Sequence, residues 1–169
     1  MKQRLYILLA LCCPLFVFCQ DITGLWKGTM YNDSTKQSLA YELVITKDNG
    51  KYSGFSYTWF LINEKEYYGI KKIKVRIAKD GKVIIQDDEL IDNNYPIQPH
   101  KNVYQLNVLD LTNVNNETIL DGLFVTNPTK KYCELTGHIK VKKASQLSQS
   151  DLVKYLQKNN VEKTLTKLK

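Results

Sequence analysis

Cysteine and histidine are both scarce in this 169-residue chain, and their scarcity excludes several kinds of chemistry. Three of the four cysteines lie within the first 19 residues, so Cys133 alone remains in the rest of the sequence. A lone cysteine cannot form an intrachain disulfide. The two histidines, His100 and His138, fit no His-Glu-x-x-His motif, and Cys-x-x-Cys and phosphate-loop patterns are also missing. We therefore expect no enzyme activity, no catalytic residues, no metal site and no cofactor.

Long apolar runs are also rare, and the one that exists is N-terminal. Residues 1–19 read MKQRLYILLALCCPLFVFC, with Lys2 and Arg4 ahead of the apolar stretch. The stretch is too short to cross a bilayer comfortably and polar chain follows it. This combination predicts a secretory signal peptide over residues 1–19, and therefore a periplasmic or extracellular protein.

The expected cleavage site follows Cys19. Val17 and Cys19 are the small residues at the −3 and −1 positions, which predicts cleavage before Gln20. The alternative is a lipoprotein anchored through Cys19. Without Lys2 and Arg4, 22 basic residues face 17 acidic ones, and residues 20–169 are long enough for one domain with a core of its own.

Alternation of apolar and polar residues is the main structural signal after the leader. SLAYELVITK and GFSYTWFL each place apolar side chains at every second position, namely Leu39, Tyr41, Leu43, Ile45, Phe55, Tyr57, Trp59 and Leu61. A three-residue loop over 48–50 pairs Leu43 with Phe55 and brings these faces together, so we expect all eight side chains inside the fold. A two-residue Asn-Gly turn would instead pair Leu43 with Ser56 and mix the faces.

Further strands follow the same logic. A first strand is expected over residues 22–31, and a loop over 79–81 pairs Ile77 with Val83. In YCELTGHIKV the alternation places Cys133 inward. VYQLNVLDL changes phase, which we interpret as a β-bulge. The eight expected strands are joined mostly by short loops, which indicates an all-β fold: an eight-stranded antiparallel up-and-down barrel.

The C-terminal segment changes to a helical period. In SQSDLVKYLQKNN, Leu152 and Leu156 share a face, and Ser148 stands three residues ahead of Asp151, as in a capping box. We expect a helix over about residues 147–168, packed on the outside of the barrel.

The first expected strand opens with Gly24-Leu25-Trp26. A Gly-x-Trp at this place, followed by a strand meander and a C-terminal helix, resembles the lipocalin-like (calycin) group. The resemblance implies that Trp26 plugs the closed end of the barrel beside Gly24. Lipocalins often stack a late arginine on this tryptophan. Here Arg76 falls on the fourth strand, so this contact is either missing or made by Lys142 instead. The alternative is a buried tryptophan that opens a β-sandwich.

Two weaker resemblances accompany this one. The remainder of the chain resembles secreted bacterial proteins of unassigned function. ITGLW also resembles the opening of avidins, which use several later tryptophans around biotin. Because no tryptophan follows Trp59, the sequence does not favour a biotin site.

The expected ligand site lies at the end of the barrel that collects the longer loops, including DNNYPIQPHKN. The inward side chains expected nearest that end are Tyr41, Tyr57, Trp59, Lys71, Asp87 and Glu89. An aromatic mouth with few charges above an aliphatic floor is typical of a small-molecule pocket. Lys71 would anchor an anionic head group, so a fatty-acid-like amphiphile is the first ligand we expect. The open alternative is that these side chains fill the barrel.

A basic stripe is the other feature with a functional interpretation. Lys72, Lys74 and Arg76 alternate onto the outer face of the fourth strand, and we expect Lys140 and Lys142 beside them. Such a stripe suits an anionic envelope surface, although solubilising surface is the ordinary interpretation. We expect a monomer without a nucleic-acid partner.

Two functions remain open from the sequence. The first is a secreted or periplasmic binding protein that holds a small apolar or amphipathic ligand in the barrel. The second is a non-enzymatic envelope interaction domain with a filled core. A cavity lined by Trp59 would favour the first function, and a Trp59 outside the barrel would favour the second.

Overall fold

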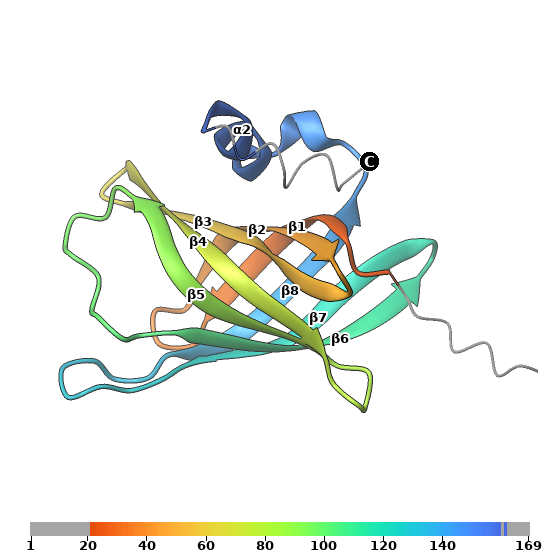
Figure 1. The fold of residues 1–169 in the computed structure, drawn as a ribbon. Coiled ribbons are helices and arrows are strands. Elements are labelled where there is room, and N and C mark those ends of the chain that lie inside the picture. Colours follow the sequence, from red (N-terminus) through yellow and green to blue (C-terminus); the bar gives the residue numbers. More distant parts are fainter. Residues whose placement is uncertain (1–20, 160, 162–169) are drawn as a thin grey trace, which may run out of the picture.

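A computed structural model describes residues 21–159 and 161. Within them, eight strands form a closed barrel in which consecutive strands pair antiparallel and β8 returns to β1 (Figure 1). The expected all-β up-and-down barrel is thus confirmed. The strands are β1 (Gly24–Asn32), β2 (Gln37–Asp48), β3 (Lys51–Ile62), β4 (Lys65–Ile77), β5 (Val83–Asn93), β6 (Gln105–Val114), β7 (Glu117–Thr126) and β8 (Thr136–Ala144). The predicted signal peptide lies outside the described residues.

The C-terminal segment packs on the outside of the barrel, as expected (Figure 1). It forms a 3-10 turn, η1 (Leu147–Gln149), and a short helix, α2 (Asp151–Lys158). The cap is Ser150 rather than Ser148, because the Ser150 side chain accepts the N–H of Val153. The predicted helix over about 147–168 is therefore divided at Ser150, and it is too long at its C-terminal end, since α2 ends at Lys158. The part of the prediction over 162–168 lies outside the described residues.

The register of β2 and β3 differs from the prediction. The turn has two residues, Asn49 and Gly50, both with positive φ, and it pairs Leu43 with Ser56. The predicted three-residue loop is wrong. It assumed that the apolar faces of β2 and β3 both point into the barrel, and this assumption does not hold for β3. The outer face of β3 is also buried, since α2 covers it, so β3 can turn its aromatic side chains outward.

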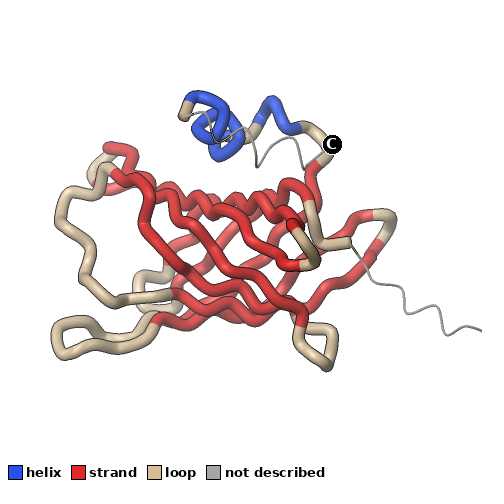
Figure 2. The backbone as a smooth tube through the Cα atoms, in the orientation of Figure 1, coloured by secondary structure: helices blue, strands red, loops and turns tan. Residues whose placement is uncertain are grey.

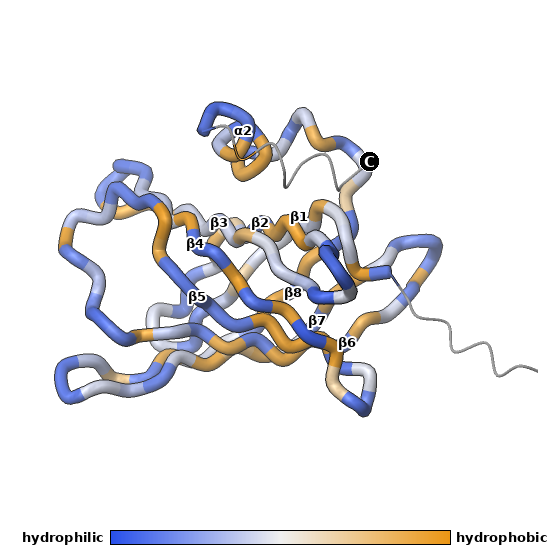
Figure 3. Tube along the Cα trace, viewed as in Figure 1, coloured by the Kyte–Doolittle hydropathy of each residue, from blue (hydrophilic) through white to orange (hydrophobic). Residues whose placement is uncertain are grey.

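The aliphatic part of the barrel is well packed around Trp26. The side chains that fill it come from every strand except β3 and from the segment before β1, and they are Ile22, Trp26, Leu43, Ile45, Ile73, Val75, Val83, Ile85, Leu109, Leu120, Ile139 and Val141. Trp26 is fully buried and donates its indole N–H to the carbonyl of Ile22 at 3.0 Å. Figure 3 shows the hydrophobic residues gathered in the strands and hydrophilic residues dominating the loops.

A lysine stands over the Trp26 ring, but it is Lys143 rather than the expected Lys142. Its ammonium lies 5.8 Å from the ring centroid and donates to the Asp21 carbonyl at 3.0 Å. Gly24, with a φ of 126°, lies against the same lysine stem. Both defined positions of the Gly-x-Trp motif, Gly24 and Trp26, therefore contact the Lys143 side chain.

Two other local predictions are confirmed or corrected by the register. Ile77 pairs with Val83 and Val75 with Ile85, as expected. The predicted bulge in β6 is absent from its register with β5 and β7; the register shifts lie instead between β4 and β5. Cys133 is exposed in the loop before β8, which contradicts its expected inward position.

Candidate functional site

A pocket opens at the end of the barrel that carries the long loops. Figure 2 shows these loops in tan at one end of the strands. Its volume is about 720 Å³, within the range of about 300–1,000 Å³ that is usual for small-molecule sites. The segment between β5 and β6 forms much of its wall, and Lys71 of β4 and Tyr132 of the loop before β8 complete it. The apolar part of the lining consists of Leu90, Tyr95, Ile97, Pro99, Val103, Tyr104 and Tyr132.

The pocket exists because β5 and β6 separate. Their pairing runs from Val83 opposite Leu109 to Gln86 opposite Leu106 and then stops. The next backbone donor, the N–H of Gln105, goes to the Asp87 carboxylate at 3.2 Å. A side-chain acceptor thus replaces the missing strand carbonyl, which satisfies a buried N–H where the ladder ends. Beyond this point the two strands leave room for a ligand.

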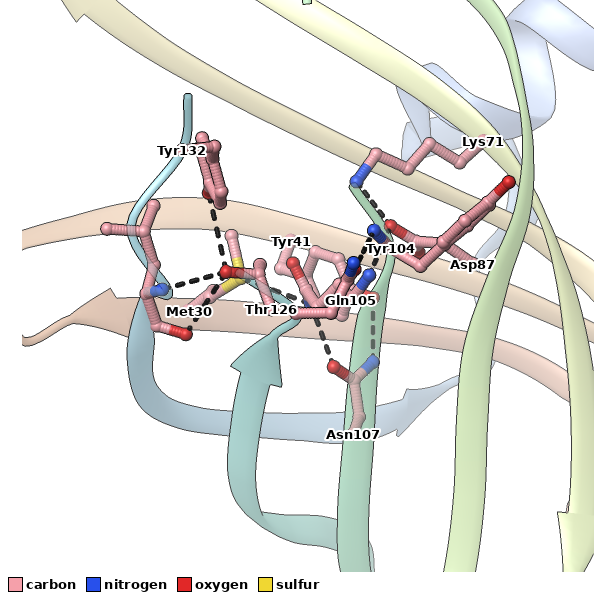
Figure 4. Close-up of polar contacts among 11 residues, drawn as sticks. Met30, Tyr41, Lys71, Asp87, Tyr104, Gln105, Asn107, Thr126 and Tyr132 are labelled. Carbon is pink, nitrogen blue, oxygen red and sulfur yellow. Dashed lines mark hydrogen bonds and ion pairs between the residues drawn. The ribbon is translucent and has the colours of Figure 1, made fainter. Parts of the chain in front are cut away.

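Lys71 and Asp87 form the charged pair at the base of the pocket (Figure 4). The Lys71 ammonium donates to the same Asp87 oxygen that accepts Gln105 N–H. The Lys71 side chain is 31% exposed and the Asp87 side chain only 6%. Lys71 lines the pocket, so the accessible charge of the pair is the cation.

A polar chain continues from this pair across the barrel interior (Figure 4). The Gln105 side chain donates to Asn107 at 2.8 Å, and Asn107 donates to the Tyr41 hydroxyl at 3.3 Å. All three residues are buried. Buried polar side chains that satisfy one another hold a single arrangement, so the polar layer separates the pocket from the aliphatic core.

Aromatic contacts fix the walls. Tyr95 packs against Phe60 with ring centroids 5.8 Å apart, and Tyr132 packs against His100 at 5.4 Å. A Cβ on Gly69 would lie 1.8 Å from the Tyr95 hydroxyl, so only glycine lets this ring sit flush on β4. The pocket therefore has rings held in place on both the β5–β6 segment and the β7–β8 loop.

The electrostatics of the site keep Lys71 charged. Burial opposes the charged form, but the Asp87 carboxylate outweighs it and raises the pKa of Lys71 above its ordinary value. Burial likewise raises the pKa of Tyr95, with Lys71 opposing the shift. At neutral pH the pocket therefore presents the Lys71 ammonium and the neutral phenol of Tyr95.

Three of the six predicted ligand residues lie where the sequence placed them. Tyr41, Lys71 and Asp87 point into the barrel at the open end. Only Lys71 lines the pocket itself, since Asp87 and Tyr41 belong to the layer beneath it.

The predicted positions of Tyr57, Trp59 and Glu89 are wrong. Tyr57 and Trp59 lie on the outer face of β3, packed against the cluster that includes Leu152 of α2. Glu89 is exposed opposite Lys72. The register shift leaves Asp88 without an opposite residue in the β4–β5 ladder, so the side chain of the next residue turns outward.

Sequence reasoning also missed several functional residues. Tyr132 was not singled out, because the alternation in YCELTGHIKV that places Cys133 inward puts Tyr132 on the outward face. Gln105 and Asn107 are the inward residues of β6, and the change of phase in VYQLNVLDL was their signal. The alternation in β6 is regular if polar side chains are also accepted as inward residues, since Gln105, Asn107 and Leu109 are all buried.

A buried carboxylate on the outer face of β2, opposite Tyr57 of β3, holds α2 against the barrel. Glu42 of β2 accepts the Ser150 hydroxyl at 2.6 Å and the Leu152 N–H at 3.0 Å, and it pairs with Lys27 at 3.0 Å. A carboxylate at a helix N-terminus is favourable. Tyr57 and Trp59 therefore have a structural role beneath this helix.

The basic stripe is smaller than predicted. Lys72, Lys74 and Arg76 are exposed on β4, but Lys74 is paired with Asp88. Lys140 and Lys142 lie on β8, four strands away around the barrel, and pair with Asp121 and Glu117. The two groups do not form one surface.

Neither a metal-binding cluster nor a membrane-spanning helix is found in the part of the chain that the structure describes. The comparisons with known proteins add no assignment: no family model matches the chain, and no curated protein or solved structure is significantly similar to it.

Proposed function

We propose that this protein is a non-catalytic binding protein that holds a small amphipathic molecule in the pocket between β5, β6 and the 94–104 loop. One observation carries the proposal: a pocket of about 720 Å³ combines apolar and aromatic side chains with the partly buried ammonium of Lys71 at its base. Apolar surface beside a few placed polar groups is the usual form of a small-molecule site. The Gly-x-Trp end of the closed barrel supports a lipocalin-like assignment, and residues 1–19 support export.

Trp59 lies outside the barrel, which removes the ligand position first expected and by itself favours the interaction domain. The proposal depends instead on a different ligand position, in the pocket that Lys71 lines. The aliphatic half of the barrel is occupied by its own side chains, many of them fully buried. The polar layer of Gln105, Asn107 and Tyr41 lies between this core and the mouth. A ligand therefore binds at the open end, and a long alkyl tail has no place among the residues of the core.

Native mass spectrometry of protein purified from its source tests the proposal. We expect a small molecule retained on the wild-type chain. Leu90→Trp should abolish it, because Leu90 lines the pocket, whereas Ile91→Trp should retain it, because Ile91 is exposed on the same strand. Chains free of any bound molecule, or equal retention by both variants, would refute a ligand site in this pocket.

A second candidate function, a protein interaction domain, is favoured by an apolar stripe on the barrel face formed by β5, β6 and β7. Val108 pairs with Leu123 and Leu106 with Val125, and Leu123 is 65% exposed. Surface patches of this kind mark protein contacts when they are extensive. Leu123→Lys should then disrupt a complex that sediments with the wild-type protein at native concentration; an unchanged monomer in both would argue against this function.

A further inference from the structure

In the Lys71–Asp87 pair the ammonium faces the pocket and the carboxylate is buried behind it, and this arrangement indicates a ligand class. Lysine has three N–H donors, and among the described residues Lys71 uses one of them, on Asp87. The Asp87 oxygen in this pair is already shared with the N–H of Gln105. The pair therefore offers donors to the pocket and keeps its acceptor in the wall.

The other charged side chains of the lining are Asp88 and Lys101. Lys74 engages the Asp88 carboxylate, so this acidic residue is already paired. Lys101 is exposed, whereas the Lys71 side chain is only partly exposed. An anionic group that enters the pocket therefore meets the Lys71 ammonium at its base.

Asp87 limits the charge that the base can accept. Its carboxylate is buried next to Lys71, so the pair is close to neutral as a unit. A ligand with two negative charges would face Asp87 at short range in a medium of low dielectric constant, where like charges repel strongly. A monoanion, such as a carboxylate, avoids this cost while using the free N–H donors of Lys71.

The walls favour a flat and short ligand body. Tyr95 and Tyr132 line the pocket, and each is held by a second ring, Phe60 and His100 respectively. Rings that are already fixed present flat faces, on which a planar group stacks at little cost in side-chain entropy. The occupied core below the polar layer excludes a long chain.

From these observations, and resting on the proposed function, we infer that the ligand is a small carboxylate that carries a planar ring, with Lys71 as its anchor. Asp87 is then a positioning residue, which directs the ammonium and selects against dianions.

Titration calorimetry on exhaustively dialysed wild-type protein tests this with 3-phenylpropanoate, 3-phenylpropanamide, octanoate and phenyl phosphate. We expect the acid to bind roughly tenfold or more tightly than the amide, since a hydrogen bond to a charged group is worth about 1.5–3 kcal/mol. Octanoate and phenyl phosphate should both bind less tightly than 3-phenylpropanoate.

Matched variants assign the residues. Lys71→Met with Asp87→Leu replaces both charges by apolar groups and so avoids a lone buried charge; it should bind acid and amide equally. Lys72→Met, on the next and outward-facing residue, should behave as wild type. Asp87→Asn should raise the affinity for phenyl phosphate relative to 3-phenylpropanoate, an effect that a purely structural role would not produce.

Several results would overturn the inference. Equal binding of acid and amide by the wild type would show that the ligand needs no anionic group. Tighter binding of octanoate would show that it needs no ring, and tighter binding of phenyl phosphate would show that the site does not select a monoanion. If no probe binds although native protein retains a molecule that Leu90→Trp abolishes, the ligand class is wrong and the pocket stands. If native protein retains nothing, the proposed function itself fails.

Discussion

The Asp87 carboxylate accepts the backbone N–H of Gln105 at 3.2 Å, one residue beyond the last paired residues of β5 and β6. The same oxygen receives the Lys71 ammonium. One side chain therefore ends a strand ladder, holds the Lys71 ammonium of the pocket and belongs to the polar layer beneath it. The opening of the barrel and its electrostatics depend on the same residue.

Replacing Asp87 by alanine should lower the free energy of unfolding by about 2–4 kcal/mol, because it leaves a buried N–H and the Lys71 ammonium without their acceptor. Partial exposure of Lys71 places the result toward the lower value. Urea unfolding followed by circular dichroism measures it. Asp88→Ala is the matched control: its carboxylate pairs with the exposed Lys74, so the expected loss is below about 1 kcal/mol. Equal losses for the two variants would contradict the role assigned to Asp87.

Replacing Glu42 by alanine should release α2 from the barrel. The carboxylate accepts from the Ser150 hydroxyl and from Leu152 N–H, and no other side chain is placed to substitute for it among the contacts described. Hydrogen exchange should become faster in residues 150–158 while amides of β6 and β7 keep their protection. Asp151→Ala, which removes only an exposed pair with Lys154, should leave the pattern nearly unchanged. Uniform acceleration throughout the barrel would show that Glu42 supports the whole fold instead.

Trp26→Ala should cost about 3–5 kcal/mol of unfolding free energy, as large truncations in a core do. Trp26 is fully buried among aliphatic residues, whereas Trp59 is half-buried under α2. Trp59→Ala should therefore cost clearly less. In Trp59→Phe the remaining fluorescence should resist acrylamide quenching, and in Trp26→Phe it should be quenched more readily; the reverse order would place the two indoles wrongly.

Alkaline pH should destabilise the fold through Tyr57. Burial, followed by nearby carboxylates, raises its pKa from 10.0 to about 12. Because the folded state holds the phenol proton more tightly than the unfolded chain, this contribution is complete below pH 10 and is lost as the pH rises toward 12. By linkage, about 1 kcal/mol should be lost by pH 11.

Urea midpoints measured between pH 8 and pH 11.5 test this assignment. Tyr57→Phe should make the decline shallower without removing it, because burial also raises the pKa of Tyr41 and of Tyr95. Tyr31→Phe, at an exposed position on β1, should follow the wild type. A decline of the same slope in Tyr57→Phe and wild type would assign the effect to other tyrosines.

Local alternation in the sequence was enough to predict the barrel, the inward faces of β1 and β2, the pairing of Ile77 with Val83 and the burial of Trp26. It also placed Tyr41, Lys71 and Asp87 correctly, because strands with one buried face carry their orientation in a period of two. These features depend on neighbours that are close in the chain.

The tertiary structure alone decided the orientation of β3, the separation of β5 from β6 and the identity of the pocket walls. Alternation assigns a strand to one buried face, but β3 has two, since α2 covers the side chains of Tyr57 and Trp59 from outside. The polar inward residues of β6 satisfy one another only across strands, as Asn107 does with Tyr41. A side chain's burial is set by everything that packs on it, and for these residues the partners lie far away in the chain.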